Sequence, residues 1–281
     1  MVSTRRLPGR VHRLSELADI AGSAPVEALG RRQRIFIWCC VVAVTLVAWA
    51  YLALLAYQMP AYDATALAET AMAVATPWGP ADFFFIFVMW VIMMAGMMAG
   101  SATPAMLLFA GMHAKSGASR MPMVVLSFAL GYALAWILFS AAATIVQWML
   151  HGAGIFSPAM TISNLHVAGA ILCAAGAYQF TRVKTSCLSH CRSPVGFFMT
   201  NWRDGMTGAL QMGLRHGAHC MGCCWMLMVV LFAVGVMNLL WVAVLTLVVL
   251  LEKTGRAGVL VARAAGAAMI VVGIVFLIGG V

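Results

Sequence analysis

Long apolar runs without a charged residue dominate this chain and restrict what it can fold into. Residues 35–56, IFIWCCVVAVTLVAWAYLALLA, form one such run, and residues 220–251 form another. A helix of about 20 apolar residues crosses the hydrocarbon core of a bilayer. Charged residues make up only 9% of the 281 positions, whereas a soluble domain contains about 25%. The sequence therefore predicts an integral membrane protein.

Six apolar segments predict an all-α fold, a polytopic membrane helix bundle of about six transmembrane helices. The segments cover residues 35–56, 83–112, 121–150, 165–180, 220–251 and 258–279. As a straight helix, the fifth segment would reach about 48 Å, which exceeds the hydrocarbon core of about 30 Å. We therefore expect this segment either to protrude from the bilayer or to break near Gly235 and Asn238.

Basic residues gather in two places and predict the orientation of the chain. Seven of the 17 Lys and Arg residues lie in the first 34 positions, and five more lie between Arg182 and Arg215. Because basic loops normally face the cytoplasm, we expect a cytoplasmic N-terminus and an inner (plasma) membrane location. In a six-helix arrangement both chain ends are inside, and Lys253 and Arg256 fall on the outside. A re-entrant break in the fifth segment would change this parity.

The predicted domain organisation is a basic cytoplasmic tail, 1–34, followed by a single transmembrane helical domain, 35–281. That domain contains one long polar segment, 181–219, in which residues 195–214 predict an interfacial amphipathic helix. The lipid bilayer is the expected partner, and nucleic acid is not, because there is no soluble domain to carry a basic patch. The chain has no Walker loop, nucleotide fingerprint or serine nucleophile motif, so no enzymatic activity is indicated.

The stretch HGAHCMGCCW concentrates candidate metal ligands at the start of the fifth apolar segment. Its candidates are His216, His219, Cys220, Cys223 and Cys224. On a helix, residues four and seven apart share a face, so a histidine and two cysteines would line one stripe. Thiolate and imidazole ligands together suit zinc or copper. The alternative is that these side chains only pack.

A second group, CLSHC, lies upstream in the same polar segment. Cys187 and Cys191 are one helical turn apart, with His190 between them. We expect the two groups to lie on the same side of the membrane, where soft ligands from both could meet. The alternative is a pair of ordinary thiols. Cys39, Cys40 and Cys173 lie inside apolar runs and are predicted to be buried packing residues.

Methionines form a third pattern, in the second apolar segment. Met93 and Met97 repeat at a spacing of four, and Met94 and Met98 form a parallel pair. Together they would form a stripe along one side of the helix. Thioethers favour Cu(I), but methionine is also a flexible apolar filler of helix interfaces. The stripe is thus a candidate for weaker copper sites or for simple packing.

Several segments resemble the predicted metal-binding integral membrane protein family, domain-of-unknown-function family 2182. They are YQFTRVKTSCLSHCRSP, NWRDGMTGALQMG, CMGCCWMLM, GVMNLLW and the Glu252–Lys253 pair, and MWVIMMAGMM with Pro104 resembles a further characteristic segment. The resemblance covers roughly residues 83–254. It implies a multi-helix bacterial inner-membrane protein with a role for metal.

Three functions fit these patterns. The first is binding of a soft metal, Cu(I) or alternatively Zn(II), for copper handling or delivery to a metallochaperone or a membrane-complex partner. The second is thiol–disulfide exchange, because Cys220 and Cys223 have the CxxC spacing that lowers a thiol pKa at a helix start. The third is a structural or assembly role in a membrane complex, with the cysteines serving as packing residues.

Overall fold

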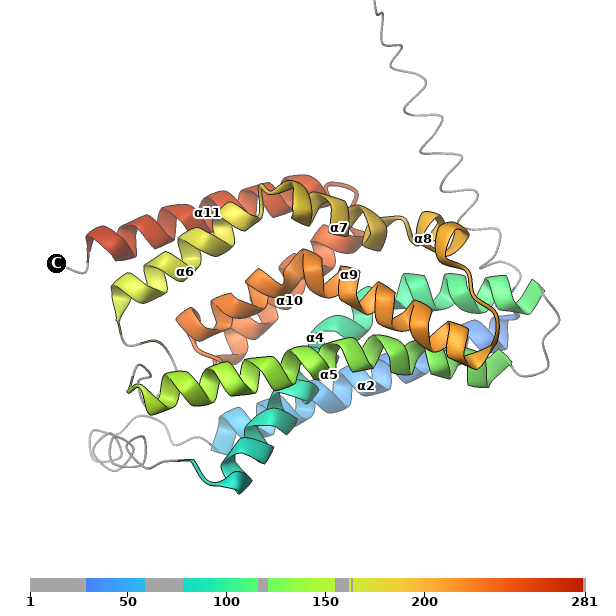
Figure 1. The fold of residues 1–281 in the computed structure, drawn as a ribbon, viewed down its shortest axis with the longest axis horizontal. Coiled ribbons are helices and arrows are strands. Elements are labelled where there is room, and N and C mark those ends of the chain that lie inside the picture. Colours follow the sequence, from blue (N-terminus) through green and yellow to red (C-terminus); the bar gives the residue numbers. More distant parts are fainter. Residues whose placement is uncertain (1–28, 59–77, 116–120, 155–161, 163, 280–281) are drawn as a thin grey trace, which may run out of the picture.

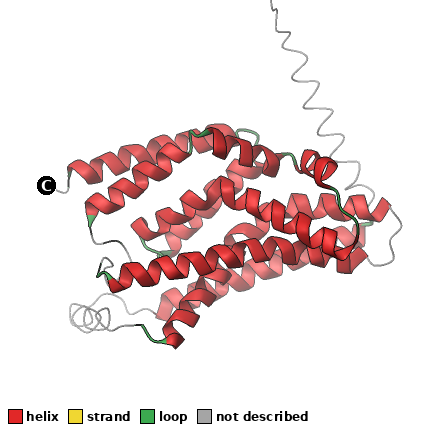
Figure 2. Ribbon diagram, viewed as in Figure 1, coloured by secondary structure: helices red, strands yellow, loops and turns green. Residues whose placement is uncertain are grey.

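The computed structural model describes residues 29–58, 78–115, 121–154, 162 and 164–279 (Figures 1 and 2). The described part is helical and contains no strand, which confirms the all-α prediction. Its helices are α2 (Arg31–Gln58), α4 (Pro80–Lys115), α5 (Met121–Gly152), α6 (Leu165–Tyr178), α7 (Arg182–Arg192), α8 (Pro194–Asn201), α9 (Gly205–Val234), α10 (Leu239–Thr254) and α11 (Gly258–Ile278). Most of the predicted basic tail, residues 1–28, lies outside the described residues.

Five of the described helices, α2, α4, α5, α9 and α11, are long and apolar enough to cross a membrane. The predicted fourth crossing, α6, has only 14 residues. At 1.5 Å per residue it spans about 21 Å, less than the hydrocarbon core of about 30 Å. It lies against α11, where a Cβ on Gly169 or Gly176 would overlap a backbone oxygen of α11. These glycines allow the two backbones to approach closely.

The centre of the bundle is the pair formed by α5 and α9, which lie along each other in Figure 1. A Cβ on Gly213 would overlap the backbone oxygen of Phe128, and one on Gly217 would meet Ala135 and Tyr132. Because these glycines carry no side chain, α5 and α9 pack at short distance. This packing brings Tyr132 against the cysteine-containing middle of α9.

The fifth apolar segment breaks at residues 235–238. Gly235 ends α9 with a φ of 104°, a conformation that favours glycine. The Asn238 side chain then accepts a hydrogen bond from the backbone N–H of Trp241 and caps α10. The chain reverses at this break, because the last turn of α10 lies beside the middle of α9, with Lys253 on Cys220.

The reversal corrects two expectations about topology. Lys253 and Arg256 were expected on the side opposite the polar segment 181–219. Instead, the Arg192 guanidinium donates to the backbone oxygens of Glu252 and Gly255, at 2.8 and 2.7 Å. The two chain ends were expected on one side, but the start of α2 and the end of α11 lie at opposite ends of the bundle (Figure 1). The physical reason is the additional pass that α10 makes.

The predicted amphipathic helix, 195–214, is divided into α8 and the start of α9. The division lies at residues 202–204, and Gly205 has a φ of 79°. Phe197 and Phe198 are 1% and 0% exposed and pack against Phe109 and Met212. The two phenylalanines therefore lie in a core of their own, whereas Met206 and Leu210 of the same predicted face are 46% and 38% exposed.

Candidate metal centre

Four cysteines meet where α7 crosses α9. Cys220, Cys223 and Cys224 of α9 are buried, and Cys191 of α7 is partly buried. The Cys191 and Cys223 sulfurs are 4.0 Å apart, much longer than the disulfide bond of about 2.05 Å. Cys191 packs against the apolar cluster that contains Cys220, Cys223 and Cys224. We call these four residues the thiol cluster.

The local structure of α9 and α7 explains why these thiols converge. Residues three and four apart share a helix face, and the thiols of Cys223 and Cys224 both donate to the Cys220 carbonyl, at 3.0 and 2.9 Å. On α7, the Thr181 hydroxyl accepts a hydrogen bond from the Lys184 N–H and caps the helix. Seven residues beyond Lys184, and thus on the same face of α7, Cys191 meets α9.

A lysine inserts its ammonium group into the thiol cluster. Lys253 is 5% exposed, and its Nζ lies 2.9 Å from the Cys220 sulfur and 3.7 Å from the Cys224 sulfur. The same ammonium lies 3.6 Å from the Met98 sulfur and 3.4 Å from the Ser101 hydroxyl. A positive charge next to sulfur stabilises the thiolate form. Lys253 thus favours the form of cysteine that binds metals.

Two further polar contacts hold the cluster in position. The Tyr132 hydroxyl lies 3.0 Å from the Cys220 sulfur. The Lys184 ammonium donates to the Glu252 carboxylate at 2.7 Å, and both side chains are at most 2% exposed. Because breaking a buried ion pair leaves an uncompensated charge, this pair fastens α7 to α10.

Sequence reasoning assigned no role in the site to Lys253, Tyr132, Lys184 or Glu252. The sequence does offer a signal for Glu252 and Lys253, because these two charges end an apolar run. They also belong to the segments that resemble the metal-binding membrane protein family. For Tyr132 there was none. Its approach to Cys220 depends on how closely α5 packs on α9.

The methionine stripe lies in the same core as the thiols. Met93, Met94, Met97 and Met98 are 1%, 0%, 3% and 1% exposed and belong to one apolar cluster with Cys220, Cys223 and Cys224. Met98 reaches the Lys253 ammonium. The stripe therefore packs against the thiol cluster, with Met98 at its edge.

The candidate histidines separate into two environments. His190 of α7 and His219 of α9 face each other, with ring centroids 4.6 Å apart. His216 is 2% exposed and lies among the rings of Phe197 and Tyr132, at centroid distances of 5.5 and 6.0 Å. The stripe expected to join His216 to Cys220 and Cys223 does exist on α9, but its histidine lies in an aromatic pocket.

The remaining cysteines differ from one another. The Cys187 sulfur lies beside Gly222, whose missing side chain leaves room for it. Burial, together with the Cys223 sulfur, raises the pKa of the Cys187 thiol. The neighbouring sulfurs of Cys220 and Cys223, together with burial, raise the pKa of the Cys191 thiol well above its usual range. Cys39 and Cys40 on α2, predicted to be buried, are exposed on the helix surface, and Cys173 is partly buried.

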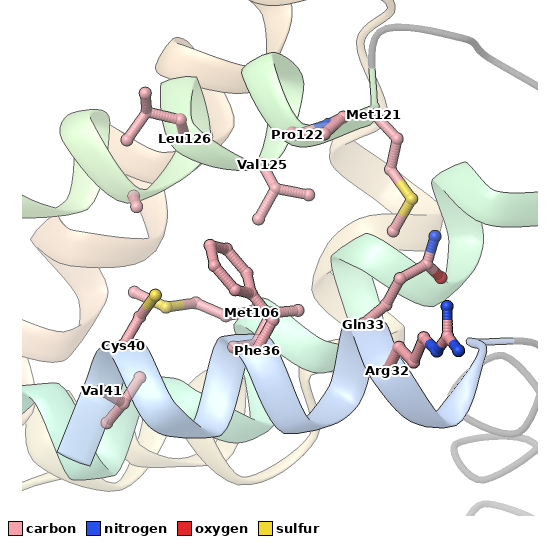
Figure 3. A pocket seen from close by; sticks show the side chains of 12 residues that line it. Arg32, Gln33, Phe36, Cys40, Val41, Met106, Met121, Pro122, Val125 and Leu126 are labelled. Carbon is pink, nitrogen blue, oxygen red and sulfur yellow. The ribbon is translucent and has the colours of Figure 1, made fainter. Parts of the chain in front are cut away.

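Two apolar cavities lie between α2, α4 and α5, away from α7. One, of about 480 Å³, is lined by Phe36, Cys40 and Met106 among others (Figure 3). The other, of about 370 Å³, reaches Met98 and Tyr132. Their presence means that α2 packs more loosely on the bundle than α9 does.

Within the described residues, no group of three or more His, Cys, Asp or Glu side chains is arranged to hold one metal ion. The arrangement does provide a sulfur pair, Cys191 and Cys223, with further thiols and a thioether close by. Such a donor set suits a soft ion that accepts few ligands.

The chain matches a known protein family. A family model described as PpoB2, copper chaperone, matches residues 87–276, from α4 to α11. No curated protein and no solved structure matches the chain. The matched range includes the thiol cluster, Lys253, the methionine stripe and the paired histidines. Since it covers more than half of the sequence, the chain belongs to this family of copper chaperones.

Proposed function

We propose that this protein is a membrane-embedded chaperone that holds Cu(I) as cargo between Cys191 and Cys223. The observation that carries the proposal is their sulfur–sulfur distance of 4.0 Å. Two metal–sulfur bonds of about 2.3 Å each span up to about 4.6 Å, so one ion fits between the sulfurs with little movement. Cys220 and Cys224 provide further thiols for taking up or releasing the ion.

Charge balance supports a monovalent ion at this position. A Cu(I) ion between two thiolates carries one net negative charge, which is costly in a buried site. The Lys253 ammonium, which lies 2.9 Å from Cys220, supplies the compensating positive charge. Zn(II) prefers a tetrahedral set of four ligands, and its structural sites are built from Cys and His. The sulfur-rich surroundings, with Met98 at the edge, favour Cu(I) over Zn(II).

The basic residues around the cluster support a cytoplasmic position. Arg192 lies at the end of α7 that adjoins the cluster, and it contacts the connection between α10 and α11 that contains Arg256. By the positive-inside rule, this end of the bundle faces the cytoplasm of a cell with an inner membrane. A reducing cytoplasm would keep the thiols free for copper and give access to a metallochaperone or a membrane-complex partner.

Thiol–disulfide exchange has less support than copper binding. Cys220 and Cys223 have the CxxC spacing, but both are buried, at 2% and 0% exposure. Exchange requires an attacking thiol that can reach its partner. A purely structural role does not explain why the Lys253 ammonium is buried among the thiols.

The proposal is tested by metal content after purification in detergent under reducing conditions. Wild-type protein is expected to bind about one Cu(I) per chain, with thiolate-to-copper absorption in the ultraviolet. The variant C191S/C223S should lose that ion, and the matched variant C39S/C40S, which changes two exposed cysteines of α2, should keep it. Equal copper content in the wild type and both variants would refute the proposal.

A further inference from the structure

His190 and His219 form a pair at the outer edge of the thiol cluster. Their rings come from α7 and α9 and are 4.6 Å apart at their centroids, with an angle of 33° between planes. Each directly precedes a cysteine of the cluster, Cys191 on α7 and Cys220 on α9. Cys220, Cys223 and Cys224 are buried, whereas Cys191 and both histidine rings are only partly buried. The pair therefore lies between the cluster and the surface.

Backbone hydrogen bonds fix the same tautomer in both rings. The Nδ1 atom of His190 lies 2.8 Å from the Ser186 carbonyl, and that of His219 lies 2.7 Å from the Arg215 carbonyl. A carbonyl oxygen only accepts, so Nδ1 carries the proton and donates in each ring. In the neutral rings, Nε2 is left with its lone pair. Histidines that bind metals are oriented by this kind of second hydrogen bond.

The basic side chains beside the pair are engaged elsewhere. Arg215 donates to the Asn201 side chain at 3.2 Å. Arg192 donates to the backbone oxygens of Glu252 and Gly255. These hydrogen bonds hold both guanidinium groups to partners other than the imidazoles.

His216 of α9 differs from this pair, because no hydrogen bond to its Nδ1 orients the ring within the described residues. Its ring is buried among Phe128, Tyr132 and Phe197. Its Nδ1 has no hydrogen-bond partner within the described part of the chain. The orientation of His190 and His219 is therefore not a general consequence of position on α7 or α9.

We propose that His190 and His219 form a separate imidazole site, which takes up copper at the protein surface and passes it to the thiol cluster. This inference rests on the proposed function. The step is a ligand exchange without redox change: a Cu(I)–imidazole bond breaks as a Cu(I)–thiolate bond forms, and the thiol proton leaves to solvent. Imidazole binds copper less tightly than thiolate does, so transfer runs toward the cysteines.

The first test measures the rate of copper uptake. The full-length protein in detergent receives Cu(I) from a coloured bicinchoninate complex, and the loss of colour is followed. The variant H190N/H219N keeps an amide N–H near each Nδ1 position and removes Nε2, so the backbone hydrogen bonds are retained. We expect uptake at least about tenfold slower than in wild type, with the same final copper content. The exposed His166 of α6 provides the matched control, H166N.

The second test examines the imidazole site without the cysteines. Cu(II) is added to the C191S/C223S variant, and the electron paramagnetic resonance spectrum of the bound copper is expected to show coupling to nitrogen. This coupling should disappear in the quadruple variant that also carries H190N and H219N. This readout does not depend on Cu(I) binding to thiols, so the two proposals can fail separately. Wild-type uptake rates in H190N/H219N, or a nitrogen signal that survives the substitution, would overturn the imidazole site. A loss of final copper content in H190N/H219N would show that the histidines belong to the thiol site itself.

Discussion

The same dipeptide, Cys-Cys, occurs in two apolar helices of this protein with opposite surroundings. Cys39 and Cys40 are exposed on α2, and Cys223 and Cys224 are 0% exposed on α9. Within the most apolar 18-residue stretch of each helix, 17% of the residues are buried in α2 and 50% in α9. Helix α7, Lys253 and Tyr132 lie around Cys223 and Cys224. The chemistry available to these thiols therefore depends on the elements that enclose them and not on the dipeptide alone.

The largest expected effect comes from breaking the buried ion pair between Lys184 and Glu252, which joins α7 to α10 beside the thiol cluster. In E252Q the Lys184 ammonium remains buried without its carboxylate, and we expect the free energy of unfolding to fall by about 3–5 kcal/mol. Thermal unfolding in detergent measures this loss. The double variant K184M/E252Q should recover a large part of it, because no charge is then left alone. If E252Q is as stable as wild type, the ion pair does not hold α7 to α10.

Adding a side-chain carbon at a helix interface should cost more stability at α9 than at α2. A Cβ on Gly213 would overlap the Phe128 backbone, so G213A is expected to lower stability by about 3 kcal/mol. At the α2 interface, a Cβ on Gly96 would lie 3.0 Å from the Ala48 Cβ. Because that contact is looser, G96A should change stability by less than about 1 kcal/mol. Melting temperatures of both variants test the contrast, and equal losses would contradict it.

Removing the buried ammonium should weaken copper binding without removing any sulfur. In K253M the bound Cu(I)–thiolate pair loses its compensating charge, and we expect its affinity to fall by about a hundredfold. The exposed Arg256 gives a matched control, because R256M keeps the backbone oxygen that Arg192 contacts. Competition against a Cu(I) chelator of known affinity measures the difference. An unchanged affinity in K253M would mean that Lys253 does not balance the site.

The smallest effect is expected at Tyr132. The variant Y132F removes the contact with the Cys220 sulfur and a long hydrogen bond of 3.4 Å to the Met98 carbonyl, and it keeps the ring that packs on α9. A buried hydrogen bond contributes about 1 kcal/mol, so copper affinity should change by about fivefold. The same competition measurement applies. A change as large as that of K253M would indicate that Tyr132 does more than orient Cys220.

Much of this description was already contained in the sequence. Apolar runs without charge predicted a helical membrane protein, since such segments are stable only in a bilayer or a core. The length of the fifth run, with Gly235 and Asn238 inside it, offered the break that the structure has. The residue types and helical spacing of His216, Cys220 and Cys223 predicted one stripe of soft ligands, because spacing along a helix is a local property.

Only the tertiary structure decided which of these residues meet. The reversal after Gly235 brings Lys253 to Cys220, 33 residues away in sequence, where the linear order had predicted the opposite side. The pairing of Cys191 with Cys223 and the separation of His216 from His219 likewise depend on how α7, α5 and α9 pack. Sequence determines helices through local periodicity, whereas contacts between distant residues follow from the packing of whole helix faces.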